Sequence, residues 1–294
     1  MQKRRKFRLR LGSQTLVLGE RTLVMGVLNV TPDSFSDGGK FLEPEAAVEQ
    51  AFTMEKAGAD LLDVGGESTR PGSREASAAE ELDRILPVLE ALRGLIKIPI
   101  SVDTRRAAVA ELALRAGAEI INDISGLRHD PRIADVATRE GVPLILMHMR
   151  GEPRTMQAGP FAQDVMKDVI QGLRRSLAIA RKAGVAKSQI IVDPGIGFGK
   201  SFAQNYELLQ KLPQLAKLGY PLLIGASRKG FLGAALARDG KPAPPEERIW
   251  GTAATVTASI LNGAHIVRVH DVAEMVQVAR VADCLLDPKL RPRN

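Results

Sequence analysis

The amino-acid sequence predicts an α/β protein folded as a (β/α)8 barrel, and three observations support this prediction. Short apolar segments rich in Val and Ile alternate eight times with amphipathic helical segments. These apolar segments are continuous rather than alternating, which is typical of parallel strands buried on both faces. The length also fits, because one such barrel takes about 250 residues and the chain has 294. A doubly wound open sheet is the runner-up.

The eight predicted strands follow one rhythm along the chain. Helical segments between them end in Gly, the residue favoured just after a helix, as in the repeats AGAD, AGAE and NGAH. The strands are predicted over residues 22–30, 60–66, 98–103, 119–125, 142–149, 189–195, 220–227 and 265–271. Before them, weak alternation around Gly12 and Gly19 predicts a β-hairpin. The whole chain, 1–294, is therefore expected to be one domain: a hairpin (1–21), the barrel (22–285) and a tail (286–294).

Composition excludes several classes of protein. The formal net charge is +7, but aromatic residues make up only 4% and the basic residues concentrate only in residues 3–10, which disfavours a nucleic-acid partner. We interpret that basic run as a solvated first strand. No apolar run is long enough to span a bilayer, and no secretory signal follows the basic start. The single cysteine, Cys284, excludes an internal disulfide, so a cytoplasmic protein is expected.

Polar residues gather where the predicted strands end. In a barrel, the carboxyl ends of all strands meet at one mouth, where the chemistry of such proteins is found. A single Asp or Asn at a strand end more often caps the next helix, but eight strands sharing the feature favour a functional site. The principal candidates are Asn29, Asp37, Arg70, Asp103, Asn122, Asp193, Lys229, Arg268 and His270.

The chemistry of these side chains indicates a nitrogen heterocycle that carries a diphosphate. Carboxylates and amides can bind the edge of a flat heterocycle rich in N–H donors, and the candidates are Asp103, Asn122 and Asp193. Cationic groups suit a phosphate or a carboxylate, and the candidates are Arg70, Lys229, Arg268 and His270. Hard oxygen donors suit a Mg²⁺ ion bridging a polyphosphate, and the candidates are Asn29 and Asp37.

Two further features have ordinary interpretations. The segment PGIGFGKS (194–201) resembles a phosphate-binding loop, but Pro194 and Lys200 stand where the motifs require Gly. Its glycines are therefore expected to shape the turn after the sixth barrel strand. His148 fits a structural role as well as a catalytic one. The two longest non-periodic stretches, 31–44 and 65–77, are expected to be functional loops at the barrel mouth.

At these strand ends the chain resembles the dihydropteroate synthase family over nearly the whole barrel, from residue 22 to about 285. The blocks that carry the resemblance are LNVTPDSFSDGG (28–39), DVGGESTRPG (63–72), SVDT (101–104), INDISG (121–126), LMHMRG (146–151), DPGIGFGK (193–200), GASRKG (225–230) and RVHD (268–271). The resemblance implies a (β/α)8 barrel that joins 6-hydroxymethyl-7,8-dihydropterin diphosphate to 4-aminobenzoate and releases pyrophosphate. Sulfonamides compete with the aminobenzoate in this family.

The resemblance also implies roles for individual residues. The pterin-binding set is Asp103, Asn122, Asp193 and Lys229, with Met147, Phe198 and Gly225 around the same pocket. The diphosphate set is Asn29, Thr69, Arg70, Arg268 and His270, with Asn29 and Asp37 near the metal. The aminobenzoate pocket is expected to form near Phe35, Pro71 and Ser227. The catalytic residues would be Arg70, Asp103, Lys229, Arg268 and His270, assisted by Mg²⁺.

The chain departs from the family at one position. The family usually has Ser after the SRK triplet, where its hydroxyl can contact the aminobenzoate carboxylate, but this chain has Gly230. Weaker binding of aminobenzoate and of sulfonamides is therefore expected.

Alternative functions and the oligomeric state are open at this point. A methyltetrahydrofolate:corrinoid methyltransferase would share the pterin-binding positions but would not need the loops or the cations. A non-catalytic pterin-binding barrel should show broken site positions. The family is commonly a homodimer, and helix 249–261 could be the interface or could simply cover the barrel.

Overall fold

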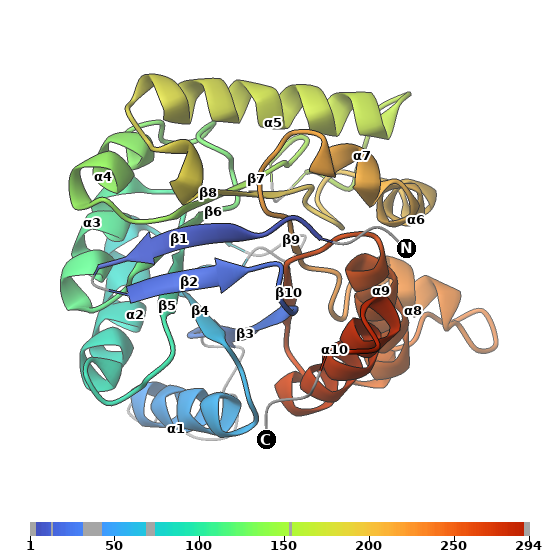
Figure 1. Cartoon of the computed structure of the whole chain (residues 1–294), viewed down its shortest axis with the longest axis horizontal. Helices are drawn as coiled ribbons and strands as arrows, with labels where there is room; N and C mark the ends of the chain where they lie inside the picture. The colour runs from blue at the N-terminus through green and yellow to red at the C-terminus, as the bar shows by residue number, and fades with distance from the viewer. Residues whose placement is uncertain (1–3, 13, 32–42, 69–73, 153–154, 291–294) are drawn as a thin grey trace.

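In the computed structural model, eight parallel strands form a barrel with helices around it (Figure 1). The structure describes residues 4–12, 14–31, 43–68, 74–152 and 155–290. The barrel strands are β3 (Leu23–Asn29), β4 (Leu61–Gly65), β5 (Ile100–Asp103), β6 (Ile120–Asp123), β7 (Leu144–Met147), β8 (Ile190–Asp193), β9 (Leu223–Ile224) and β10 (Ile266–Val269). All eight lie within the predicted segments, so the predicted fold class is confirmed.

The strands pair in chain order, as in a (β/α)8 barrel, and helices connect the parallel neighbours. Their order in the sheet is β8-β7-β6-β5-β4-β3-β10-β9. A parallel bridge between Val192 and Leu222 joins β8 to the residues just before β9, so the sheet curls round on itself. The strand residues are buried except for Asn29, Asp103 and Arg268, which explains why the strands are otherwise almost continuously apolar.

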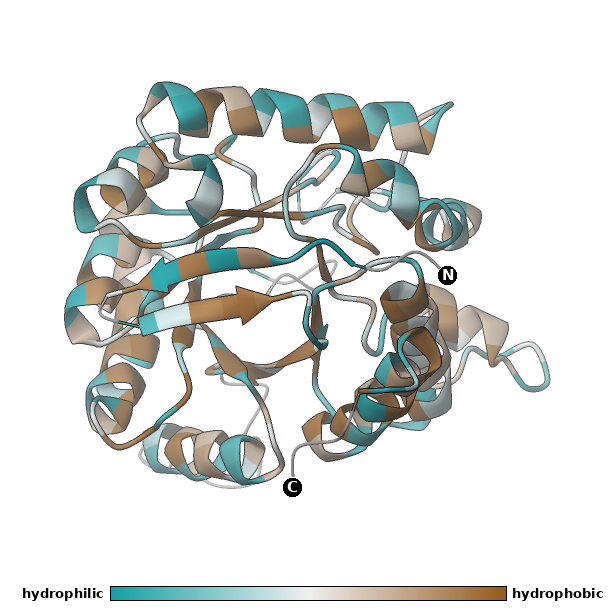
Figure 2. Cartoon of the chain, in the orientation of Figure 1, coloured by the Kyte–Doolittle hydropathy of each residue, from teal (hydrophilic) through white to brown (hydrophobic). Residues whose placement is uncertain are grey.

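Helices cover the outside of the barrel and pack their apolar faces on the strands. Figure 2 shows hydrophobic and hydrophilic residues alternating along α5, as expected of an amphipathic helix. The helices are α1 (Glu43–Lys56), α2 (Ala78–Leu92), α3 (Ala107–Ala116), α4 (Ile133–Glu140), α5 (Val165–Lys182), α6 (Phe202–Gln210), α7 (Leu212–Ala216), α8 (Gly230–Ala235), α9 (Ile249–Leu261) and α10 (Val272–Leu286). Two short 3-10 helices are η2 (Lys187–Gln189) and η3 (Pro245–Arg248). No described helix is long and apolar enough to cross a membrane.

The predicted hairpin is present as β1 (Phe7–Leu11) and β2 (Gln14–Leu18), which pair antiparallel and cross in front of the barrel in Figure 1. Its inward leucines pack on the first inward-facing residues of the barrel strands. This buried layer consists of Leu9, Leu11, Leu18, Leu23, Met25, Leu61, Ile120, Ile145, Ile191, Leu223 and Ile266. The hairpin therefore fills the amino-terminal end of the barrel.

Among residues 4–10, the described part of the basic run, not every basic side chain is solvated, which corrects the expectation from sequence. Lys6, Arg8 and Arg10 are exposed, but the side chain of Arg4 is buried. Its guanidinium donates to Asp283 at 2.5 Å and to Thr22 at 2.6 Å. Burial requires this pairing, because an unpaired cation away from water is costly. Arg4 thus ties the start of the described chain to α10.

Candidate active site

Strand periodicity explains how the polar residues converge. Side chains alternate between the two faces of a strand, so every second residue points into the barrel. Leu61 belongs to the apolar layer, and Asp63 and Gly65 follow it on the same face of β4. The register then pairs Asn29 with Gly65, Gly65 with Asp103, and Asp103 with Asn122. The barrel interior is therefore apolar at its amino-terminal end and polar at its carboxyl end.

A cavity of about 820 Å³ opens at the carboxyl ends of the strands. It is lined by every candidate site residue that the structure describes. These are Asn29, Asp103, Asn122, Met147, Asp193, Phe198, Gly225, Ser227, Lys229, Arg268 and His270. The remaining candidates lie outside the described residues, namely Phe35, Asp37, Thr69, Arg70 and Pro71.

Arg268, which lines this cavity, is held by two carboxylates from neighbouring strands. Its Nε donates to Oδ2 of Asp63 at 2.6 Å, and its second terminal nitrogen donates to Oδ2 of Asp103 at 2.8 Å. These carboxylates raise the pKa of Arg268, although burial opposes them. Arg268 is therefore a fixed positive charge among acceptors.

Asp63 is a site residue that the sequence analysis missed. It is fully buried, and Oδ2 also accepts from Nδ2 of Asn122 at 2.9 Å. Asp63 thus orients both Arg268 and Asn122. Because the NH2 group of the Asn122 amide faces Asp63, the amide oxygen faces away from Asp63. An isolated carboxylate inside an apolar strand, as in DLLDVGG, was the available signal.

Burial raises the pKa values of two carboxylates that line the cavity, Asp103 and Asp193. The pKa of Asp103 rises to about 7 because burial outweighs the attraction of Arg268. The pKa of Asp193 rises to about 6, again mainly through burial, with the Gly195 amide opposing the shift. That amide donates to Oδ1 of Asp193 at 2.7 Å. Both groups are acceptors at alkaline pH and gain a proton when the solution becomes acidic.

Lys229 extends over an aromatic wall of the cavity. Its Nζ lies 4.0 Å from the centroid of the Phe198 ring, a favourable cation–π arrangement. Burial and the charge of Arg268 lower the pKa of Lys229 to about 8. Phe198 belongs to an apolar cluster with Ile124, Met147, Met149 and Met156. This cluster offers a flat ring a hydrophobic surface beside a cation.

His270 and Ser227 form a polar pair at the mouth. Ser227 Oγ lies 3.0 Å from Nδ1 of His270 and accepts from the His270 backbone amide at 3.2 Å. Burial, with the charge of Arg268, lowers the pKa of His270 to about 3. His270 is therefore neutral in this structure, and it offers a hydrogen bond rather than the positive charge considered from sequence.

The loop that presents Lys229 is held in an unusual conformation. Arg228 has a left-handed φ of 57°, which costs energy for a residue with a side chain. Asp271 binds the Arg228 guanidinium, and the backbone amide of Arg228 donates to Thr252 Oγ1 at 3.1 Å. Arg248 donates to the Arg228 carbonyl at 2.8 Å. These contacts aim Lys229 into the cavity.

Lys200 is a second residue that the sequence analysis did not assign. It is buried, lines the cavity, and its Nζ lies 2.8 Å from the Phe198 carbonyl and 3.2 Å from Nδ1 of His148. Burial lowers the pKa of Lys200 to about 7. The His148 ring packs so closely on α5 that a Cβ at Gly172 would lie 2.3 Å from it. The His148 ring is therefore fixed between α5 and Lys200.

The glycines of the segment 194–201 shape a tight turn, as expected from sequence. Gly195 has a φ of 67°, and a Cβ there would lie 2.0 Å from the carbonyl oxygen of His148. Gly199, at 66°, meets the carbonyl of Arg150 in the same way. Neither position accepts a side chain, so the glycines place Phe198 and Lys200 beside the cavity.

Comparison with known proteins agrees with this barrel fold. The sequence pattern of the family described as pterin binding enzyme matches residues 25–270. The chain is 51% identical over 267 residues to the dihydropteroate synthase of Synechocystis sp., covering 91% of each protein. It is 47% identical over 268 residues to that of Bacillus subtilis, covering 91% of this chain and 90% of the relative. The chain therefore belongs to the pterin-binding enzymes, and within them to the dihydropteroate synthases, which are transferases.

Solved structures give the same result. The dihydropteroate synthase of Xanthomonas albilineans with 4-aminobenzoic acid has a TM-score of 0.88 and 41% identity, covering 96% of this chain and 99% of that one. The Yersinia pestis enzyme, solved as a sulfonamide drug complex, has a TM-score of 0.88 and 43% identity, covering 96% and 100%. The predicted family is thus confirmed.

Proposed function

We propose that the protein joins 6-hydroxymethyl-7,8-dihydropterin diphosphate to 4-aminobenzoate, giving 7,8-dihydropteroate and pyrophosphate in folate biosynthesis. One observation carries the proposal: a single cavity holds acceptors for a donor-rich heterocycle beside cations for a diphosphate. A relative from Xanthomonas albilineans has been solved in complex with 7,8-dihydropteroate. This relative supports the proposed product.

The pterin ring would lie in the deep polar layer. Asp193 and the outward carbonyl of Asn122 can accept from its amino and ring N–H groups, while Lys229 can donate to its carbonyl oxygen. The apolar cluster around Met147 and Phe198 would cover a ring face. The aminobenzoate would approach from the mouth, near Ser227.

The chemical step would be loss of pyrophosphate from the pterin methylene carbon. The carbon–oxygen bond breaks, and its electron pair leaves with the diphosphate. Asp103 would stabilise the positive charge that develops on the pterin, and Arg268 and His270 would bind the leaving oxygens. The aminobenzoate nitrogen then forms a bond to the methylene carbon and loses a proton.

The described donors fit a Mg²⁺ ion that is bound mainly by substrate. Among the described residues, no cluster of three or more His, Cys, Asp or Glu could hold a metal, but Asn29 offers one oxygen at the cavity wall. Mg²⁺ commonly keeps waters and binds one or two protein groups together with substrate phosphates. Asn29 and Asp37 would hold the Mg²⁺ ion, which would neutralise part of the negative charge of the diphosphate.

The decisive test is to incubate the protein with both substrates and Mg²⁺ and to follow pyrophosphate and dihydropteroate together. Equal amounts of both, with product formation suppressed by a sulfonamide, support the proposal. Pyrophosphate alone would show that only the pterin half works. Neither product, with pterin binding retained, would favour the methyltransferase or the non-catalytic alternative. The homodimer and the cytoplasmic location stay predictions from sequence.

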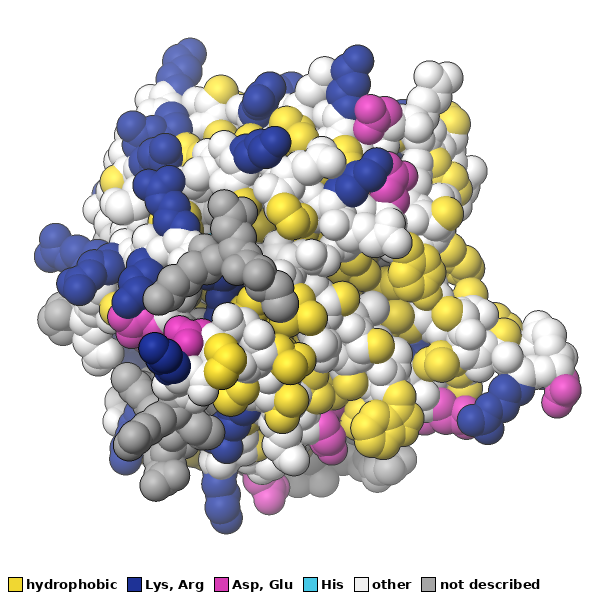
Figure 3. Space-filling view, turned by 45° about the vertical axis from the view of Figure 1, so that its right-hand side comes forward, with side chains coloured by type: hydrophobic (Ala, Val, Ile, Leu, Met, Phe, Trp, Pro, Cys, Tyr) yellow, Lys and Arg dark blue, Asp and Glu magenta, His cyan; other side chains and the backbone are white. Residues whose placement is uncertain are grey.

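Helices α9 and α10 expose apolar side chains that could form the interface of the predicted homodimer. α9 buries Val256 and Ile260 against the barrel but leaves Trp250 79% exposed, and Val281 and Leu285 on α10 are exposed as well. Figure 3 shows hydrophobic side chains gathered over this side of the molecule. Helix 249–261 therefore covers the barrel and still offers an apolar face, and sedimentation analysis would determine the oligomeric state.

We expect pterin binding to weaken as the pH falls from 7.5 to 5. Burial raises the pKa of Asp103 to about 7 and that of Asp193 to about 6. Each carboxylate therefore gains a proton within this range and loses an acceptor, so the affinity is highest where both are ionised. Calorimetric titration with 6-hydroxymethylpterin, which lacks the diphosphate, measures the effect. An affinity that rises on acidification would contradict these roles.

We expect Gly230→Ser to tighten aminobenzoate binding. Gly230 lines the cavity at the start of α8, and a Cβ there meets no heavy atom within 4 Å. One added hydrogen bond contributes about 0.5–1.5 kcal/mol. The KM for 4-aminobenzoate and the inhibition constant of a sulfonamide should both fall about threefold to tenfold. An unchanged KM would show that the hydroxyl makes no such contact.

A further inference from the structure

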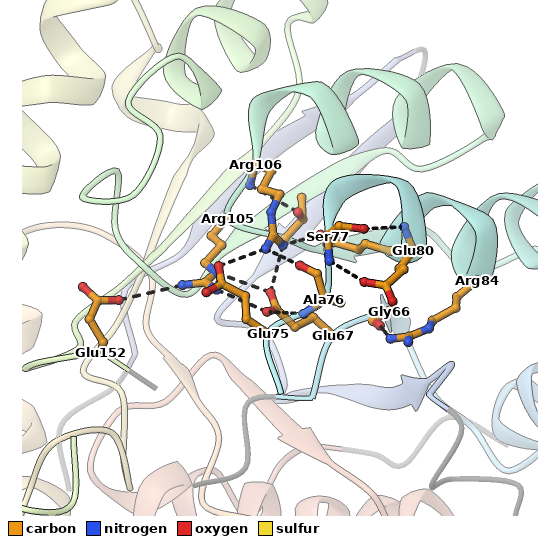
Figure 4. Close-up of polar contacts among 12 residues, drawn as sticks. Gly66, Glu67, Glu75, Ala76, Ser77, Glu80, Arg84, Arg105, Arg106 and Glu152 are labelled. Atoms are coloured by element: carbon orange, nitrogen blue, oxygen red, sulfur yellow. Dashed lines mark hydrogen bonds and ion pairs between the residues drawn. The ribbon is translucent and has the colours of Figure 1, made fainter. Parts of the chain in front are cut away.

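Two kinds of cation are largely buried near the cavity, and they differ in their partners. Between the β4–α2 and β5–α3 connections, Arg105 and Arg106 bind the carboxylates of Glu67 and Glu75 (Figure 4). Such pairing is the usual way to offset the cost of burying a charge. Lys200, in the β8–α6 connection, is 1% exposed, and its ammonium contacts neutral acceptors instead. Its contacts therefore indicate a role in holding the backbone.

The Lys200 ammonium has three acceptors, which come from two connections. Nζ donates to the Phe198 carbonyl at 2.8 Å and to the His148 carbonyl at 3.3 Å, and it lies 3.2 Å from Nδ1 of His148. Burial, followed by the charge of Lys200, lowers the pKa of His148 to about 2, so the ring is neutral and Nδ1 can accept. An ammonium has three N–H donors, and each of them has a partner here. Lys200 thus ties the β8–α6 connection to the residue that follows β7.

The turn after β8 is rich in glycine. Gly195, Gly197 and Gly199 have φ values of 67°, 85° and 66°, and glycine loses more conformational freedom on folding than any other residue. Side chains hold the middle of the turn, because Asn205 accepts from the Gly197 amide at 2.6 Å and Gln157 donates to the Gly197 carbonyl at 2.7 Å. The turn therefore depends on side-chain contacts for a fixed shape.

Phe198 presents its ring to the cavity from this turn. Its backbone amide donates to the Gly195 carbonyl at 3.1 Å, and its carbonyl accepts from Lys200. Lys229 packs on the same surface, since a Cβ at Gly197 would lie 2.9 Å from Cδ of Lys229 and the ammonium lies over the Phe198 ring. A shift of the Phe198 backbone would therefore move both the ring and the lysine that packs on it.

Lys200 also places a positive charge near Asp193. Burial raises the pKa of Asp193 to about 6, opposed first by the Gly195 amide and then by the charge of Lys200. Burial lowers the pKa of Lys200 to about 7, so its ammonium is charged in acidic solution and favours the ionised form of Asp193 there. The other titratable groups that act on this pair are His148, Asp168, Arg128, Lys229 and Arg268.

We propose that Lys200 is a positioning residue for the pterin pocket, whose ammonium holds the turn after β8 against the β7–α5 connection and so fixes Phe198 and Lys229. This inference rests on the proposed function, in which Phe198 covers a face of the pterin ring while Lys229 and Asp193 bind its polar edge. Lys200 acts through these residues rather than on the reacting atoms. Its loss should therefore weaken binding of the bare pterin as well as of the pterin diphosphate.

The test compares Lys200→Met with Lys200→Gln, His148→Leu and a control. Lys200→Met keeps an unbranched side chain of similar length and removes the donors and the charge, whereas Lys200→Gln restores an N–H donor without the charge. His148→Leu removes one of the three acceptors and leaves Lys200 in place. The control is Arg4→Met, which deletes another buried cation, with its side chain 4% exposed, at a site that binds Thr22 and Asp283.

Each variant is assayed for Tm, for kcat/KM with the pterin diphosphate, and for 6-hydroxymethylpterin affinity between pH 5 and 7.5. We expect Lys200→Met to raise the dissociation constant at pH 7 about threefold to 100-fold, within the range of coupling between contacting residues, and to lower kcat/KM in parallel. Lys200→Gln should recover part of this affinity, because it can again donate to the Phe198 carbonyl. His148→Leu should show a smaller loss, and Arg4→Met should bind the pterin like the wild-type protein.

The pH profile separates positioning from a general loss of stability. In both Lys200 variants the affinity should begin to fall at a higher pH than in the wild-type protein, because no ammonium favours the ionised form of Asp193. In Arg4→Met the profile should not move, whatever the change in Tm.

Two results would overturn the inference. Lys200→Met with the pterin affinity and pH profile of Arg4→Met would show a purely structural role. If Lys200→Met does not fold, a folded His148→Leu decides: weakened affinity supports the inference, and wild-type affinity overturns it. A wild-type protein that neither binds 6-hydroxymethylpterin nor forms dihydropteroate would contradict the proposed function, and that failure is distinct because it appears before any variant is compared.

Discussion

Replacing Arg268 by alanine is expected to impair both folding stability and turnover more than any other single change at the site. The guanidinium neutralises two carboxylates, Asp63 and Asp103, that neighbouring strands hold in the barrel interior. Removing one partner of a buried pair leaves an uncompensated charge and costs about 3–5 kcal/mol. Loss of a group that binds the leaving pyrophosphate should also lower kcat by roughly 100-fold or more.

A double variant separates these two effects. Adding Asp63→Asn to Arg268→Ala removes one of the two carboxylates that lose their partner while keeping the side-chain size, so part of the stability should return and turnover should not. Urea unfolding measures the first quantity and steady-state kinetics the second. Arg21→Ala is the control, since Arg21 pairs with Asp60 away from the cavity. A single variant as stable and active as this control would refute the central role of Arg268.

Asp193→Ala should remove measurable pterin binding. Asp193 is buried at the cavity wall, with Oδ1 already bound to the Gly195 amide. Two N–H groups of the ligand would be left unpaired in a buried site, at about 1–3 kcal/mol each. The dissociation constant should therefore rise roughly 30-fold or more.

Calorimetric titration with 6-hydroxymethylpterin tests this expectation without turnover. The matched control is Asp130→Ala, because Asp130 is also buried and accepts from a backbone amide, that of Ala107 at 3.0 Å, but belongs to the β6–α4 connection. The control should lose stability and keep pterin affinity. Affinity retained by Asp193→Ala would place the pterin elsewhere in the cavity.

The sequence was sufficient to predict the barrel because one local rule repeats eight times. Apolar strands that end in polar residues indicate both parallel pairing and a shared mouth. Asn29, Asp103 and Asn122 were found in this way, and the register places them at one level of the barrel. Such residues are recognisable because their position within a strand determines the face they occupy.

Residues that act through distant partners could not be predicted in the same way. The value of Asp63 lies in its contact with Arg268, 205 positions away. The sequence shows Lys200 as a departure from a glycine motif, but it does not show that Lys200 contacts His148 and the Phe198 carbonyl. Only the folded structure shows which of these charges are paired and buried.

The hairpin that fills the amino-terminal end of the barrel has a kinetic consequence. Since the apolar layer blocks passage through the described barrel, substrates and products share the route through the carboxyl-terminal mouth. Asn122 and Asp193, which would bind the pterin, belong to barrel strands, whereas Ser227 and Gly230 belong to the segment that follows β9. An aminobenzoate that arrived first would obstruct the pterin, so we expect turnover in a compulsory order, with the pterin diphosphate entering before its acceptor.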